Sequence, residues 1–156
     1  MLAKSKHRAK EWVAKAIEFY KASGKDIALA EFTNTHGPFV QDEMYIFVLD
    51  SRGNMVAHGV NEKYADKSFM DLKDSTGKNF IREIVETANA KGSGWVEYQW
   101  YNPTTKKTKP KSLYFEKIDD LIICSGIYIV RLMDIISHDL EHMRGDEHFG
   151  ECLPMI

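Results

Sequence analysis

The sequence has few cysteines, no long apolar run and no excess of one charge. Each of these shortages limits the kind of protein that the chain can be. The two cysteines, Cys124 and Cys152, form no Cys-x-x-Cys motif, so cysteine usage does not indicate a redox compartment. The longest apolar run, 121–130, includes a glycine and is about half the roughly twenty residues that a bilayer span needs. No apolar signal-peptide core follows Met1. We therefore expect a soluble chain without a membrane segment; a leader or anchor upstream of Met1 stays open.

Charge argues against a nucleic-acid partner. The chain has 21 lysines and arginines against 23 aspartates and glutamates, a formal net charge of −2. Non-specific nucleic-acid binding needs a concentrated positive surface. The lysine-rich stretches at 4–10 and 106–111 alternate along an amphipathic helix and flank a turn, respectively. With 156 residues, 44% of them hydrophobic, we expect one globular domain.

Apolar periodicity predicts helices at the start, in the middle and at the end of the chain. The first helix ends near Gly24, and a shorter one covers 26–32. A third covers 80–88 and ends at Gly92 and Gly94, and a polar amphipathic helix covers 129–143. The first helix carries an apolar stripe at helical spacing, made of Ala9, Trp12, Val13, Ala16, Ile17 and Tyr20.

Five strands are predicted between these helices. Residues 44–49 and 55–58 form a pair joined by the turn residues 50–54. Residues 95–101, 111–117 and 121–127 form three antiparallel strands. Because strands and helices do not alternate throughout, a doubly wound parallel sheet is disfavoured. The pattern predicts an α+β fold of PAS-like plan, with a five-stranded antiparallel sheet, helices packed against it and a pocket between the sheet and its connecting loops.

Several motifs together are similar to the single Cache domain. They include the first helix, the stretch 24–32, and the segment 39–50 followed by Gly53 and 57–59. Each motif is weak, and their order and spacing carry the resemblance. The later ones are Asp71–Asp74, Gly77-Lys78, Gly94–Trp100, Asn102-Pro103, Lys111–Tyr114 and Gly126–Tyr128.

The resemblance implies a sensing module of chemoreceptors, sensor kinases or free-standing secreted proteins. It implies a periplasmic or extracytoplasmic location, although a cytoplasmic one stays open because no signal peptide is visible. It also implies small organic ligands, often short carboxylates. The sequence carries no cofactor motif, so we expect no cofactor. We divide the chain into a ligand-binding domain at 8–128, an amphipathic helix at 129–143 and a tail at 144–156. The polar helix after Tyr128 departs from a receptor, which would continue into the membrane, and favours a free-standing domain or an unusual output helix.

A short carboxylate needs a cation, neutral donors and an apolar wall. Tyr98 and Trp100 are two residues apart on a strand and so face the same way, and Lys111 lies just across the following turn. Alternatively, Lys111 faces solvent at a strand start and His58 is a structural histidine. The predicted ligand-binding set is Tyr45, His58, Tyr98, Trp100, Lys111 and Tyr114.

Signals for other functions are weaker. No nucleophile has a plausible base, so we expect no catalytic residues and no enzyme. His138 and His142 have the i, i+4 spacing of metal ligands, but two ligands make a weak site and we expect no metal. Residues 137–140 resemble a histidine-kinase phospho-acceptor box without its ATP-binding domain. The alternatives left open are a homodimeric interaction module built on the first and last helices, with a vestigial pocket, and a small cone-shaped α+β enzyme.

Overall fold

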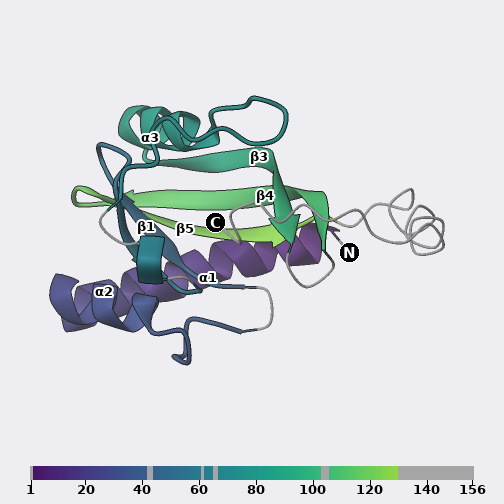
Figure 1. Ribbon diagram of the computed structural model, residues 1–156. Coiled ribbons are helices and arrows are strands. Elements are labelled where there is room, and N and C mark those ends of the chain that lie inside the picture. Colours follow the sequence, from purple (N-terminus) through teal and green to yellow (C-terminus); the bar gives the residue numbers. More distant parts are fainter. Residues whose placement is uncertain (1, 42–43, 61, 65–66, 103–105, 130–156) are drawn as a thin grey trace.

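A five-stranded antiparallel sheet forms the centre of the molecule, with helices on both faces (Figure 1). The structure is a computed structural model that describes residues 2–41, 44–60, 62–64, 67–102 and 106–129. Its strands follow the order β2-β1-β5-β4-β3. In Figure 1, α3 covers one face of the sheet, while α1 and α2 cover the other. The predicted α+β, PAS-like architecture is confirmed for these residues.

The three described helices form where the apolar pattern predicts them. Helix α1 is Leu2–Ser23, α2 is Lys25–Thr33 and α3 is Phe80–Lys91. Gly92 ends α3 in the left-handed conformation (φ 86°), and its N–H donates to the carbonyl of Ala88. Every residue of the predicted α1 stripe is buried: Ala9, Trp12, Val13, Ala16, Ile17 and Tyr20.

The strands differ from the prediction mainly at their ends. Strand β1 is Phe47–Asp50, β2 is Met55–His58, β3 is Ser93–Asn102, β4 is Lys107–Ile118 and β5 is Leu121–Tyr128. A short 3-10 helix, η1, is Glu62–Tyr64. The prediction that Gly94 ends a helix is wrong, because Gly94 pairs with Phe115 inside the β3–β4 ladder.

Alternation along the strands divides the core into two clusters. One lies between the sheet and α3 and includes Phe47, Phe80, Tyr98 and Phe115. The other lies between the sheet and helices α1 and α2 and includes Tyr114. The central strands therefore contribute side chains to both layers, and a polar residue in the middle of one, such as Lys111 or Ser125, lies inside a packed core.

The predicted helix at 129–143 and the tail at 144–156 lie outside the described residues, except for Ile129. Its N–H donates to the carbonyl of Pro110 at 2.8 Å. Among the described helices, none combines the length and the apolar character needed to cross a bilayer.

Candidate functional site

Lys111 is a fully buried cation on the α3 side of the sheet. Its side chain is 0% exposed, which excludes the alternative that it faces solvent. Its Nζ donates a hydrogen bond of 2.8 Å to the hydroxyl of Tyr45. It also lies 4.6 Å from the ring centroid of Tyr45 and 5.2 Å from that of Tyr128, within the range of cation–π attraction. Because lysine is almost never fully buried without a polar partner, this position is under strong chemical constraint.

Gly126 makes room for the Lys111 side chain. A Cβ atom at position 126 would lie 2.7 Å from Cε of Lys111 and 3.0 Å from Cδ1 of Leu113. Gly126 pairs with Leu113 in the β4–β5 ladder, two residues along the ladder from the Lys111–Tyr128 pair and on the same face of the sheet. The lysine therefore bends back over the glycine toward Tyr45. This packing explains physically why a glycine stands at the start of the Gly126–Tyr128 motif.

Tyr98 lies directly opposite Lys111 in the β3–β4 ladder. Its ring stacks on Phe80 with centroids 4.0 Å apart and an interplanar angle of 5°. Burial raises the pKa of Tyr98 and of Tyr45 well above the ordinary value, so both phenols stay neutral near pH 7. Neutral phenols beside a buried ammonium can donate hydrogen bonds to an anion without repelling it.

His58 lies in the same cluster and presents a neutral ring. It is 0% exposed, and its Nδ1 accepts a hydrogen bond of 3.2 Å from the N–H of Val60. The hydrogen-bond network therefore assigns the proton to Nε2, which makes His58 a donor at that atom. Its ring centroid lies 5.1 Å from that of Tyr45 and 5.1 Å from that of Tyr64.

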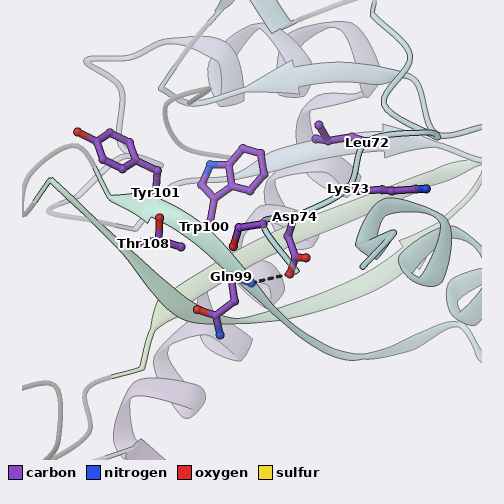
Figure 2. Close-up of a pocket in the computed structure, with 8 residues that line it drawn as sticks. Leu72, Lys73, Asp74, Gln99, Trp100, Tyr101 and Thr108 are labelled. Carbon is purple, nitrogen blue, oxygen red and sulfur yellow. Dashed lines mark hydrogen bonds between the residues drawn. The ribbon is translucent and has the colours of Figure 1, made fainter. Parts of the chain in front are cut away.

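Trp100 lines an open pocket of about 230 Å³ at the end of β3 (Figure 2). Its side chain is 7% exposed, and no described residue partners its indole N–H. A buried N–H without a partner costs about 1–3 kcal/mol. In Figure 2 the indole stands between Tyr101 and Leu72. The lining residues are Leu72, Lys73, Asp74, Ser75, Gln99, Trp100, Tyr101 and Thr108.

Asp74 holds the wall of this pocket to the sheet. Its Oδ2 accepts from the N–H of Gln99 at 2.8 Å, the dashed line in Figure 2. Its Oδ1 accepts from the N–H and hydroxyl of Thr76 and from the N–H of Lys78. Burial alone would raise the pKa of Asp74, but these hydrogen bonds outweigh it and lower the pKa. The loop is thus fixed by an ionised carboxylate.

The structure brings five of the six predicted residues to one face of the sheet and separates Tyr114 from them. Tyr114 lies in the cluster beneath α1, where its hydroxyl donates to Oε1 of Glu116 at 2.7 Å. Lys111 and Tyr114 are three residues apart on β4, so they must point to opposite faces. The prediction that Tyr114 lines the same site as Lys111 is therefore wrong.

Sequence reasoning missed three contributors to this region. Tyr128 entered only as the end of the Gly126–Tyr128 motif and was not in the predicted ligand-binding set, yet its ring lies 5.2 Å from Nζ of Lys111 and its hydroxyl donates to the carbonyl of Tyr101 at 3.2 Å. Asp74 carried a usable signal, since Asp-Ser-Thr-Gly is turn chemistry that an aspartate side chain organises. Gly126 carried none, because its role depends on where the side chain of Lys111 bends.

Within the described part of the chain, no group of three or more His, Cys, Asp or Glu residues could hold a metal ion. His138 and His142 lie outside that part. The site therefore consists of one buried cation, neutral phenol, imidazole and indole donors, and aromatic walls. Such a set has the chemistry that binding a small anion requires, and its described residues include no nucleophile–base pair of the kind that covalent catalysis uses.

The comparisons agree with the fold. A family model described as "Cache domain" matches residues 7–143. This chain is 30% identical to the "Sensor histidine kinase MctS" of Rhizobium johnstonii over 87 residues. The match covers 54% of this chain and 19% of that protein.

Solved structures with the same fold include the methyl-accepting chemotaxis protein of Vibrio parahaemolyticus. It superposes with a TM-score of 0.70 at 25% identity, covering 82% of this chain and 90% of that one. Another is a Cache chemosensory domain whose structure is described as showing carboxylic acid recognition. It gives a TM-score of 0.63 at 24% identity and covers 82% and 92% of the two chains.

Proposed function

The chain belongs to the Cache domain family of sensory ligand-binding domains, and we propose that it senses a short carboxylate bound at Lys111. The observation that carries this proposal is a fully buried ammonium 2.8 Å from a phenol and flanked by two aromatic rings. A carboxylate satisfies such a cation with charge-assisted hydrogen bonds, which are about twice as strong as neutral ones. The fold neighbour described as recognising a carboxylic acid supports the same ligand class.

The rest of the binding site is formed by neutral donors. Tyr45 and Tyr98 are phenols kept neutral by burial, and His58 is a neutral imidazole with its proton at Nε2. An anion beside them therefore meets one positive charge and several donors. The stacked rings of Phe80 and Tyr98 supply an apolar wall for the carbon end of a small acid.

The signalling pathway that this domain serves is proposed from the proteins that it resembles. Chemotaxis receptors and sensor histidine kinases are the proteins in which the matching domains occur. We place this domain in such a signalling system, in an extracytoplasmic location. Because the match spans 19% of the sensor kinase, the downstream partner belongs to the proposal as well.

The test replaces Lys111 with methionine, which keeps the length and apolar stem of the side chain and removes its charge. Thermal shift and isothermal titration calorimetry with acetate, propanoate and butanoate measure binding. The wild type should be stabilised by at least one of these acids, and Lys111→Met should lose the stabilisation. An unchanged shift in Lys111→Met means that the carboxylate binds elsewhere, and no shift in the wild type with any acid refutes the ligand class.

A matched control is available on the same strand. Lys117 faces the same side of β4 as Lys111, and its Nζ donates to Oδ1 of Asn89 at 3.1 Å on the surface. Lys117→Met therefore removes the same charge from the same sheet face without touching the buried cluster. It should bind carboxylates as the wild type does.

A further inference from the structure

Strand β3 lies at an edge of the sheet, where its outer backbone groups have no neighbouring strand. The strand order is β2-β1-β5-β4-β3, and β3 is ten residues long. An edge of that length presents a row of N–H and C=O groups to which another chain can pair. Natural proteins therefore shorten, charge or cover their edge strands. The way in which β3 is covered thus bears on what this domain associates with.

The odd-numbered residues of β3 turn their backbone groups away from the sheet. The N–H of Lys117 donates to the carbonyl of Gly92 at 2.7 Å, so the even-numbered residues of β3 bond to β4. Trp95, Glu97 and Gln99 consequently direct both N–H and C=O outward. Among the described residues, Trp95 is one of two large apolar side chains that are exposed, at 38%. This part of the edge combines outward backbone groups with an apolar side chain that solvent reaches.

Residues 74–78, which we call the strap, close the edge at Glu97 and Gln99. Oδ2 of Asp74 accepts from the N–H of Gln99 at 2.8 Å, the dashed line in Figure 2. Nζ of Lys78 donates to the carbonyl of Glu97 at 2.6 Å. The strap thus supplies one acceptor and one donor, the groups that a neighbouring strand would present at the same place.

The strap is a single turn whose two ends hold each other. The N–H of Asp74 donates to the carbonyl of Lys78 at 2.9 Å, and the N–H of Lys78 donates to Oδ1 of Asp74 at 2.9 Å. Gly77 permits the turn with a φ of 87°. Residues 75–77 are exposed, so the turn adds little to the core. Because the carboxylate of Asp74 bonds both the turn and the β3 edge, removing it opens both.

A second copy of this chain fits the edge that the strap covers. Two β3 strands can pair antiparallel about a two-fold axis, and the register decides which side chains meet. A register centred at Glu97 would set two glutamates opposite each other, which is unfavourable. A register centred at Val96 sets Glu97 of each copy opposite Trp95 of the other, where Nζ of Lys6 lies 5.3 Å from the Trp95 ring. In that register a carboxylate meets an ammonium, so the edge complements itself in charge.

We propose that β3 is a concealed self-association edge and that the strap keeps it closed. When the strap leaves, the outward backbone groups of Glu97 and Gln99 pair with β3 of a second copy, and that copy covers Trp95. The strap then controls the assembly state of the domain. This proposal does not depend on which ligand binds at Lys111.

The experiment removes the two side chains by which the strap holds β3. Asp74→Ala/Lys78→Met deletes the acceptor and the donor, and sedimentation velocity over about a hundredfold range of protein concentration measures self-association. The variant should associate at concentrations at least about tenfold lower than the wild type, because the released backbone groups form hydrogen bonds in the dimer. Hydrogen exchange should find the Gln99 amide unprotected in the dilute variant and protected in its dimer.

Asp71→Ala/Arg82→Met is the matched control. Nη2 of Arg82 lies 3.0 Å from Oδ1 of Asp71, so this variant also removes one charge of each sign beside the same loop, but it leaves both bonds to β3 in place. It should associate as the wild type does. Adding Gln99→Pro to the strap variant should restore wild-type behaviour, because proline lacks the outward N–H that the dimer needs and is tolerated at a strand edge.

Three results overturn the proposal. The first is a strap variant that associates no more tightly than the wild type. The second is association that Gln99→Pro leaves intact or that dilution does not reverse, because it then runs through another surface or through an unfolded chain. The third is equal association of the control variant, because it then comes from a general loosening of the loop.

Discussion

Gly126→Ala tests whether the position of Lys111 depends on an absent side chain. The new Cβ would lie 2.7 Å from Cε of Lys111, against the about 3.5–4.0 Å of a comfortable carbon–carbon contact. The lysine must therefore move by roughly 1 Å. Its 2.8 Å bond to Tyr45 is the contact most exposed to that movement. A displaced lysine would also lose its charged hydrogen bond to a bound carboxylate. Because such a bond contributes about 1.5–3 kcal/mol, carboxylate affinity should fall about 10- to 100-fold.

The cost to folding should be smaller than the cost to binding. Overpacking a core costs about 1–3 kcal/mol. Gly126 does not have a positive φ, so alanine suits its backbone and recovers about 0.4–1 kcal/mol by restricting the unfolded chain. Urea unfolding should therefore show a net loss of about 1–2 kcal/mol. In a Lys111→Ala background this loss should shrink, since the clashing atom is gone.

Gly94→Ala is the matched control for crowding inside a strand. Its Cβ would lie 3.1 Å from Cζ of Phe115 and 3.1 Å from Cγ2 of Thr87, on the same face of the sheet but against other side chains. It should lose stability while keeping affinity in the calorimetric titration. If Gly126→Ala binds carboxylates as tightly as the wild type, or no more weakly than Gly94→Ala, the glycine does not position Lys111.

Two further predictions concern the surroundings of the site. Hydrogen bonds hold the folded-state pKa of Asp74 below its unfolded value, so its stabilisation is complete above about pH 4 and is lost as the pH falls through the folded pKa. Urea unfolding from pH 7 to pH 3 should thus show a smaller loss of stability in Asp74→Asn, which should be less stable than the wild type by about 1–2 kcal/mol at pH 7. Tyr114→Phe removes a hydrogen bond to Glu116 on the opposite face, so calorimetry should find unchanged carboxylate affinity and urea unfolding a loss of about 0.5–1.5 kcal/mol.

Periodicity predicted the helices and the sheet because both depend on local pattern. The α1 stripe lies at helical spacing and is buried, as expected. The residues at which strands begin and end were harder to predict from the sequence. Residues 44–46 are apolar and read as part of β1, but Met44 instead exchanges two backbone hydrogen bonds with Gln41, so β1 begins at Phe47. A residue whose backbone hydrogen bonds go to a residue close by in the sequence, instead of to a neighbouring strand, cannot be recognised from its apolar character.

Pro110 shows how tertiary position overrides a local rule. Proline is normally confined to edges because it cannot donate to a ladder. The residues up to Pro110 were interpreted as a turn, so the predicted strand started at residue 111. In the structure β4 begins at Lys107 and passes through Pro110. Its carbonyl faces β5 and accepts from Ile129, just beyond the last ladder pair of Lys111 and Tyr128. The missing N–H therefore falls outside the ladder, a circumstance that depends on where β5 ends.

For the candidate site too, some features follow from the local sequence pattern and others depend on which strands pair and in what register. That Lys111 and Tyr114 take opposite faces follows from strand alternation, so the error over Tyr114 was avoidable from the sequence. The sequence could not predict that the lysine faces the α3 layer and bends toward Tyr45. It requires the pairing of β4 with β5, which brings a glycine beside the lysine, and a tyrosine 66 residues earlier in the chain. Residue types thus predict which chemistry a strand can carry, whereas the pairing partner decides whether a lysine there becomes a buried cation.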